Sequence, residues 1–181
     1  ASSPVIRELV ESSLGSEWIA VRAIFFDKIP EANWKVPWHQ DLSVALKARG
    51  SAEGFGPWTV KDGVDHALAP DWLLEQMLAV RIHLDDCGIE NGPLRVLAGT
   101  HLFGRLSAEQ IETYRLTAFE QVLDCKAGDV LLMRPLLLHA SSAAVKPVHR
   151  RVIHLEFTAA ELPAGLSWHN ALGANSSGAK A

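Results

Sequence analysis

A histidine and an aspartate stand two residues apart in "KVPWHQDLSVAL", residues 35–46. This segment reads as a β-strand, and residues i and i+2 of a strand point to the same face. His39 and Asp41 could therefore reach one metal ion. A third ligand must come from elsewhere, and His139 is the strongest candidate because it ends the apolar run "LLLH". Two histidines and one carboxylate are the facial triad of non-haem Fe(II) oxygenases.

A second pair with the same spacing, His83 and Asp85, lies in "RIHLDD". Alternation along this strand would place Arg81, His83 and Asp85 on one polar face of a half-buried strand. That arrangement explains the second pair without a metal. Spacing alone does not separate a metal site from coincidence at either pair.

Arg150 follows His139 by eleven residues, the length of a turn and a return along the next antiparallel strand. An arginine there could lie near the metal and hold a carboxylate through two parallel hydrogen bonds. Arg150 and Arg151 face opposite ways, so only one can do so. The alternative is two surface arginines on an edge strand.

The elements that must position these residues are mostly short strands separated by turns. Apolar periodicity predicts a helix over 4–14, and β-branched and aromatic residues predict strands over 18–28, 36–46 and 78–86. Residues 49–70, rich in glycine and proline, predict a long loop with a short strand or turn inside it, of the kind that often forms a lid.

A further helix is expected over 107–115, with Ser107 and Gln110 forming a capping box. Many short strands with few helices favour a mainly β fold, a jelly-roll-like sandwich or barrel with flanking helices.

The composition is that of a globular protein with one domain, residues 1–181. Its 48% hydrophobic and 21% charged residues and net charge of −4 favour neither a nucleic-acid surface nor a membrane span. Two cysteines, Cys87 and Cys125, favour a reduced, cytoplasmic setting. The small and polar end, residues 171–181, is expected to be a flexible tail.

Four blocks in order resemble the phytanoyl-CoA dioxygenase (PhyH-like) family of Fe(II)- and 2-oxoglutarate-dependent oxygenases. They are "WHQD", "ENGPLRVLAGTHLFGRL", "GDVLLMRPLLLHASS" and "HRRVIHLEF", within residues 20–157. The resemblance implies a double-stranded β-helix, a jelly-roll or cupin-like barrel. It places the iron triad on His39, Asp41 and His139, and so decides between the two pairs. It places the arginine for the distal carboxylate of 2-oxoglutarate on Arg150, and a second hydrogen bond on Ser141.

The resemblance also implies the cofactors and the reaction. Fe(II), 2-oxoglutarate and O2 would together hydroxylate a C–H bond of a small molecule, releasing succinate and CO2. The family's "PGSH" turn appears here as "AGTH", with Ala98 and Thr100. Asp41 occupies the carboxylate position that related halogenases lack, which favours hydroxylation.

For several other residues two roles are possible. Arg81 could contact 2-oxoglutarate or an acidic substrate, or instead pair with Asp85 or Glu156. Lys28 could be a ligand or could order a loop. Trp38 and Trp58 could line the substrate pocket, although a core position is the better explanation of Trp38.

Two alternative functions stay open at this point. One is a cupin-like metal enzyme that does not use 2-oxoglutarate, for which Arg150 would be dispensable. The other is a catalytically inactive binding protein on the same scaffold. The substrate and the oligomeric state are not readable from the sequence.

Overall fold

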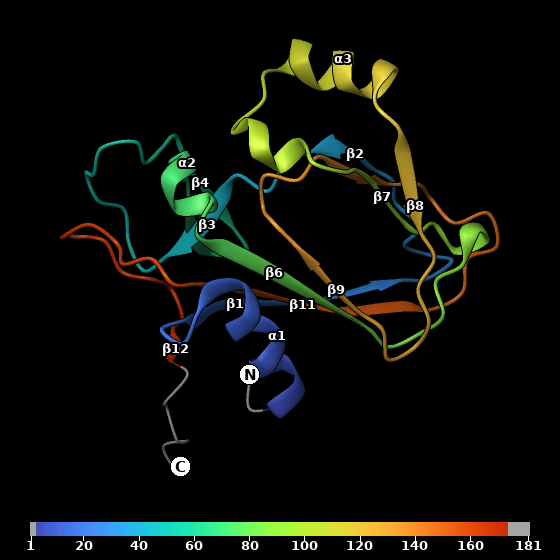
Figure 1. The fold of residues 1–181 in the computed structure, drawn as a ribbon, viewed down its shortest axis with the longest axis horizontal. Coiled ribbons are helices and arrows are strands. Elements are labelled where there is room, and N and C mark those ends of the chain that lie inside the picture. Colours follow the sequence, from blue (N-terminus) through green and yellow to red (C-terminus); the bar gives the residue numbers. More distant parts are fainter. Residues whose placement is uncertain (1–2, 174–181) are drawn as a thin grey trace. The chain divides into compact units, whose positions relative to one another are not determined.

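The computed structural model describes residues 3–173 and divides them into two compact units. Unit 1 comprises residues 3–23, 42–79 and 155–173, and unit 2 comprises residues 24–41 and 80–154. Figure 1 shows the course of the chain through both. The prediction of a mainly β fold with few helices is confirmed.

Strands carry most of the regular backbone in the described range. They are β1 (Ile19–Lys28), β2 (Val36–His39), β3 (Ser43–Leu46), β4 (Trp58–Lys61), β5 (Val64–Leu68), β6 (Met77–His83), β7 (Leu94–Leu97), β8 (Glu120–Leu123), β9 (Val130–Met133), β10 (His139–Ser141), β11 (Arg150–Thr158) and β12 (Leu172–Gly173). The helices are α1 (Pro4–Leu14), α2 (Asp71–Leu74) and α3 (Ala108–Thr117), with 3-10 turns η1 (Ile89–Asn91) and η2 (Thr100–Phe103).

Several elements agree with the sequence patterns that predicted them. Helix α1 has the predicted bounds and buries Ile6 and Val10, four positions apart on one helical face. Helix α3 begins with the predicted capping box: Ser107 Oγ accepts from the Gln110 backbone N–H, and the Gln110 side chain accepts from the Ser107 backbone N–H.

The predicted strand 36–46 is in fact two strands, β2 and β3, interrupted at residues 40–42. The Asp41 backbone N–H donates to the Pro135 carbonyl, 2.8 Å away, in place of a continuing strand ladder. Tertiary hydrogen bonding therefore overrides the local strand propensity at this point.

The predicted long loop 49–70 contains a hairpin, β4 and β5, joined at Asp62 and Gly63. Both of these residues have positive φ, 50° and 77°, as a primed two-residue hairpin turn requires. The Asp62-Gly63 pair is therefore the local sequence feature that indicates the turn of this hairpin, within the segment predicted to be mainly loop. With β3 this hairpin forms a three-stranded sheet of unit 1 in the order β3-β5-β4.

Two further sheets complete the described β structure. A five-stranded sheet has the order β12-β1-β11-β6-β9, and a four-stranded sheet of unit 2 has the order β2-β10-β7-β8. In the four-stranded sheet, β10 pairs antiparallel with both neighbours, so that His139 lies opposite His39 on one side and Val96 on the other. This register is the main determinant of the site described below.

A small core lies under α3 in unit 2. Leu97, Leu106 and Leu138 are buried at 1%, 6% and 0% exposure, and Trp38 and Tyr114 pack against them. Full burial of one such leucine contributes about 1.5–3 kcal/mol. This core fixes β2 and β7 under α3, as Figure 1 shows.

The end of the chain was predicted to be a tail over 171–181. Strand β12 pairs with β1 through Ile19↔Gly173 and Ala20↔Leu172, so the first part of that segment is hydrogen-bonded. Residues 174–181 of the prediction lie outside the described residues. Among the helices of the described part, none has the length and apolar character needed to span a membrane.

Candidate metal centre

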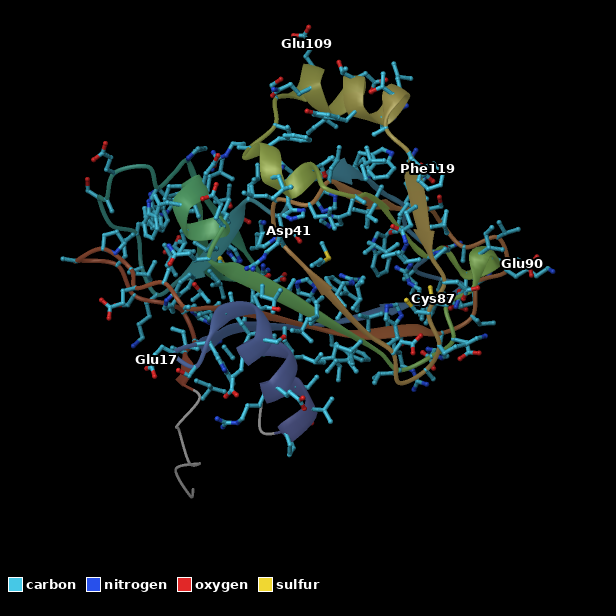
Figure 2. All side chains as sticks on the ribbon, viewed as in Figure 1. Glu17, Asp41, Cys87, Glu90, Glu109 and Phe119 are labelled. Atoms are coloured by element: carbon cyan, nitrogen blue, oxygen red, sulfur yellow. The ribbon has the colours of Figure 1, made fainter. Side chains whose placement is uncertain are left out.

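Backbone register brings the two predicted histidine ligands together. His139, which begins β10, lies opposite His39, which ends β2, and their ring centroids are 4.1 Å apart. Asp41 (labelled in Figure 2) follows two residues after His39, where the bond from its N–H to Pro135 turns the chain. One strand pairing and one interrupted strand thus position all three side chains.

The possible ligand atoms converge on one another. His39 Nε2 lies 3.5 Å from Asp41 Oδ1, and His139 Nε2 lies 3.7 Å from Asp41 Oδ2. One ligand atom from each residue can be chosen so that all lie within 4.8 Å of one another. Separations of this size suit three ligands around one transition-metal ion.

Each histidine is oriented by a backbone carbonyl two residues before it. His39 Nδ1 lies 2.9 Å from the Pro37 carbonyl oxygen, and His139 Nδ1 lies 2.8 Å from that of Leu137. With Nδ1 protonated and donating to the carbonyl, Nε2 presents its lone pair beside Asp41. Metal-ligating histidines are held in this way by an acceptor for their other ring nitrogen.

Burial and charge act on the protonation of all three ligands. At His39 burial would lower the pKa, but the hydrogen bond and the charge of Asp41 outweigh it and raise the pKa. Burial would raise the pKa of Asp41, but hydrogen bonding from His39 and the charges of both histidines outweigh it and hold the pKa well below its usual range. Burial lowers the pKa of His139 to about 4, against the opposing effect of Asp41. The carboxylate is therefore ionised and His139 neutral at neutral pH.

Gln40 lies between the two ligands, directly after the end of β2, and its side chain joins separate segments of the chain. Its amide nitrogen donates to the carbonyls of Gly104 and Leu136, and its amide oxygen accepts from the Leu106 N–H at 2.8 Å. The side chain is 6% exposed, so all of these bonds are shielded from water. Gln40 thereby fixes the chain between the two ligands to two separate segments of unit 2.

Three cationic side chains of unit 2 form a group next to the triad: Lys28, Arg81 and Arg150. The pKa of Arg81 is lowered to about 10, first by burial and then by the charge of Arg150, while the Asp41 carboxylate opposes this shift. Burial lowers the pKa of Lys28, and the charges of Arg150 and Arg81 lower it further. The cations therefore extend from the Asp41 end of the site toward Lys28.

Of these cations, Lys28 and Arg150 are buried and Arg81 is half-buried. Lys28 is 1% and Arg150 7% exposed, and within residues 3–173 no carboxylate forms an ion pair with either. Arg150 donates to the Gly92 carbonyl, and Arg81 lies 3.1 Å from His154 Nδ1. The buried Nε atoms of Arg81 and Arg150 have no hydrogen-bond partner. Unpaired buried charge is costly, so this group fits an anion.

Among the site residues, Lys28 has the weakest sequence evidence for its position. Its ammonium donates to Ser141 Oγ at 3.2 Å and to the Ser142 carbonyl at 3.0 Å, and lies 5.4 Å from the centre of the Trp34 ring. Burial, together with Arg150, lowers its pKa to about 8. A lysine at the end of a strand is usually exposed, so the local sequence does not predict the burial of Lys28.

The second histidine–aspartate pair does not form the predicted polar face. β6 ends at His83, which is 3% exposed, and neither of its ring nitrogens has a hydrogen-bond partner. Asp85 lies beyond the strand and binds Arg151 at 2.6 Å. Of the two alternative partners considered for Arg81, Asp85 forms an ion pair with Arg151 and Glu156 forms one with Arg22.

The two tryptophans considered for the pocket lie in different units. Trp38 packs on the Leu97, Leu106 and Leu138 core and lies 5.3 Å from the Arg95 guanidinium, a position that favours the core reading. Trp58 begins β4 in unit 1, so its role in a pocket stays a prediction.

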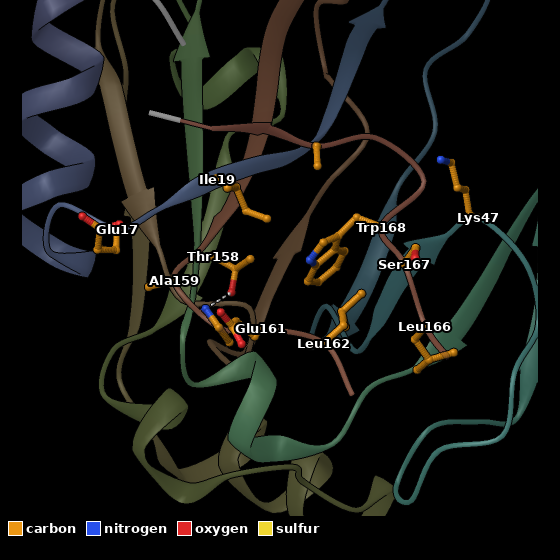
Figure 3. Close-up of a pocket in the computed structure, with 12 residues that line it drawn as sticks. Glu17, Ile19, Lys47, Thr158, Ala159, Glu161, Leu162, Leu166, Ser167 and Trp168 are labelled. Atoms are coloured by element: carbon orange, nitrogen blue, oxygen red, sulfur yellow. Dashed lines mark hydrogen bonds between the residues drawn. The ribbon is translucent and has the colours of Figure 1, made fainter. Parts of the chain in front are cut away.

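Unit 1 contains a separate cavity of about 670 Å³ beside the start of β1 (Figure 3). Its wall includes Ile19, Leu162 and Trp168, with Glu17 and Lys47 also lining it. None of the residues predicted to bind metal or cosubstrate lines this cavity.

The chain belongs to the phytanoyl-CoA dioxygenase (PhyH) family, whose model matches residues 2–152. The resemblance identified from the four sequence blocks is therefore confirmed. A search of curated protein sequences finds no match.

Solved structures share the fold at low sequence identity. EvdMO1 is 24% identical with a TM-score of 0.62, over 87% of this chain and 31% of that one. The apo form of ThoJ, described as a non-heme monooxygenase, is 22% identical with a TM-score of 0.63, over 94% and 58%. EctD from S. alaskensis, solved with 2-oxoglutarate and 5-hydroxyectoine, is 18% identical with a TM-score of 0.61, over 84% and 48%.

These similarities confirm the predicted jelly-roll class of fold. The chain spans less than two thirds of the length of each of these structures.

Proposed function

We propose that this chain is an Fe(II)- and 2-oxoglutarate-dependent oxygenase that hydroxylates a C–H bond of a small molecule, with release of succinate and CO2. The observation that carries the proposal is the position of a His-Asp-His triad next to buried cations that have no acidic partner. The triad supplies ligands for iron and the cations supply positive charge for a dicarboxylate, so one region of unit 2 suits both iron and 2-oxoglutarate.

His39, Asp41 and His139 are the residues that would hold the iron. Two neutral imidazoles and one carboxylate match the donor set of non-haem Fe(II), and three protein ligands leave positions open for cosubstrate and O2. The bonds from Nδ1 to the Pro37 and Leu137 carbonyls direct each Nε2 at the same point. Bound iron would supply the redox chemistry with O2, and the chain would supply orientation and charge.

Arg150, Lys28 and Ser141 are the residues that would bind the distal carboxylate of 2-oxoglutarate. Ser141 Oγ already accepts from Lys28, so its hydroxyl hydrogen can point at a carboxylate oxygen. The charges of Arg150 and Asp41 both act on the pKa of Arg81. Arg81 would therefore contact 2-oxoglutarate between the metal-binding end and the distal carboxylate of that molecule. A bound dianion would offset the mutual repulsion of these cations.

Burial gives these contacts their strength. His139, Ser141 and Arg150 are at most 7% exposed, so hydrogen bonds formed there compete little with water. Hydrogen bonds to charged groups are worth about 1.5–3 kcal/mol each in proteins.

The finer features of the proposal concern the substrate and the cell compartment. A small molecule suits the family and a chain of net charge −4, which favours no nucleic-acid partner. The two free cysteines support a cytoplasmic location.

The proposal is tested by succinate formation with Fe(II), 2-oxoglutarate and O2 in the presence of a panel of small molecules. We expect wild type to form succinate and Asp41→Ala to form none. If Arg150→Ala turned over a substrate as fast as wild type, a cupin-like enzyme independent of 2-oxoglutarate would replace this proposal. If wild type bound neither metal nor 2-oxoglutarate, the inactive scaffold would be the better account.

A further inference from the structure

The two cysteines of the chain face each other across an isolated antiparallel bridge in unit 2. The Cys87 N–H donates to the Cys125 carbonyl at 2.7 Å, and the Cys125 N–H donates to that of Cys87 at 3.3 Å. A residue pair that exchanges both bonds has Cα atoms about 5.5 Å apart. Disulfides span Cα separations of roughly 4.4–6.8 Å, so the backbone already has a spacing that a disulfide can bridge.

Both thiols are free, and each is held by a weak contact. Cys87 Sγ donates to the Asn91 carbonyl and Cys125 Sγ to the Leu123 carbonyl, both at 3.8 Å. At this length a thiol hydrogen bond stabilises little, so either sulfur can turn toward the other at small cost.

Cys87 (labelled in Figure 2) and Arg150 bind neighbouring carbonyls of one short segment. Cys87 Sγ donates to the Asn91 carbonyl, and Arg150 donates to the carbonyl of Gly92, the next residue. Burial raises the pKa of the Cys87 thiol, and the charge of Arg150 opposes that rise. The Asn91–Gly92 segment therefore connects Cys87 with the position of Arg150.

We propose that Cys87 and Cys125 form a reversible disulfide that weakens the binding of 2-oxoglutarate at Arg150. The second half of this inference rests on the proposed function. Disulfide formation would draw the Cys87 sulfur toward Cys125 and away from the Asn91 carbonyl. The Asn91–Gly92 segment, whose Gly92 carbonyl accepts from Arg150, would then lose a contact that holds it in place.

The oxidant is a peroxide. Cys125, at 8% exposure against 0% for Cys87, meets it first. The Cys125 thiolate attacks one peroxide oxygen, the O–O bond breaks, and a sulfenic acid and one water form. The Cys87 sulfur then attacks the Cys125 sulfur, the S–O bond breaks, and a second water leaves. Two thiol hydrogens and two electrons thus reduce hydrogen peroxide to two waters.

The test uses the whole metal-free chain, treated with hydrogen peroxide and freed of it before further steps. Free thiols are counted after denaturation, and the intact mass is measured. We expect both thiols to disappear within the monomer, with a mass loss of two hydrogens, and dithiothreitol to restore them. The protein is then loaded with Ni(II) and titrated with 2-oxoglutarate by calorimetry. We expect Kd to be about tenfold higher in the oxidised protein, a change of about 1.4 kcal/mol.

Cys125→Ser is the matched control. It keeps the Cys87 contact with the Asn91 carbonyl, so its Kd should equal that of reduced wild type and should not change with peroxide. The inference is overturned if the thiols persist, if they gain oxygen without pairing, or if the disulfide forms and Kd stays unchanged. If reduced wild type bound no 2-oxoglutarate, the proposed function and the effect of the disulfide on 2-oxoglutarate binding would both be contradicted. The thiol count would still show whether the disulfide forms.

Discussion

The chain holds two histidine–aspartate pairs with the same spacing, His39–Asp41 and His83–Asp85, and they have different surroundings. At the first, backbone carbonyls accept from the far nitrogen of each of two histidines and direct the near nitrogens at one carboxylate. At the second, the strand ends between the two residues, and Asp85 turns to Arg151. The difference teaches that a metal site is defined by the groups that orient the ligands and by a third ligand, not by spacing.

The largest expected difference between the two pairs is in metal affinity. Replacing Asp41 by Ala removes one of three ligands, so we expect Ni(II) affinity to fall by more than the roughly 100-fold that loss of an outer partner can cost. Calorimetric titration of the metal-free protein measures it. Asp85→Ala removes only a contact to an exposed arginine, and equal losses in both variants would break the comparison.

The neighbouring arginines Arg150 and Arg151 allow the same comparison for the cosubstrate. Arg150 is buried beside Ser141 and Lys28, whereas Arg151 is exposed and bound to Asp85. We expect Arg150→Ala to raise the Kd for 2-oxoglutarate about 30- to 100-fold, since a charged hydrogen-bonded contact is worth about 2–3 kcal/mol. Ni(II) affinity should not change. Arg151→Ala should bind both as wild type does, and a weakened cosubstrate affinity there would point to the wrong arginine.

Lys28 sharpens the comparison through pH. Its pKa, lowered to about 8, means that the ammonium is charged below pH 8 and becomes neutral as pH rises through that value. We expect the Kd for 2-oxoglutarate to rise between pH 7 and pH 9 in wild type, by roughly tenfold for loss of one charged contact. Lys28→Met should show the high Kd at both pH values. A pH response that survives in Lys28→Met would assign it to another group.

The smallest expected effect is at Ser141. The hydrogen bond from the uncharged Ser141 hydroxyl to the carboxylate belongs at the low end of the roughly 1.5–3 kcal/mol for bonds to charged groups, so Ser141→Ala should raise the Kd for 2-oxoglutarate by about tenfold or less. The neighbouring Ser142 contacts Lys28 only through its backbone carbonyl, so Ser142→Ala is the control. Equal Kd values in the two variants would remove Ser141 from the account.

Sequence patterns were sufficient for elements whose signals are local. Helix α1 follows from its apolar periodicity, and the start of α3 follows from the pairing of Ser107 with Gln110. The break after His39 could not be predicted, because it depends on a hydrogen bond to Pro135, far away in the chain.

The same division holds at the site. The ligand types are visible in the sequence, and the family resemblance selected His139 as their partner. The hydrogen bonds of the two histidines to the Pro37 and Leu137 carbonyls, the burial of Lys28 and the contact of Cys87 with the Asn91 carbonyl are tertiary features, and residue identity does not encode them locally. The spacing of Asp85 matches that of Asp41, the family resemblance selected Asp41, and the bond of Asp85 to Arg151 is visible only in the structure.

The most direct test of the account is anaerobic titration of the metal-free protein with Fe(II) and then 2-oxoglutarate, followed by visible absorption. A charge-transfer band that appears only when both are present, and is absent in Asp41→Ala but present in Asp85→Ala, is the predicted result. No band with wild type, or a band that survives in Asp41→Ala, would contradict the assignment of the triad.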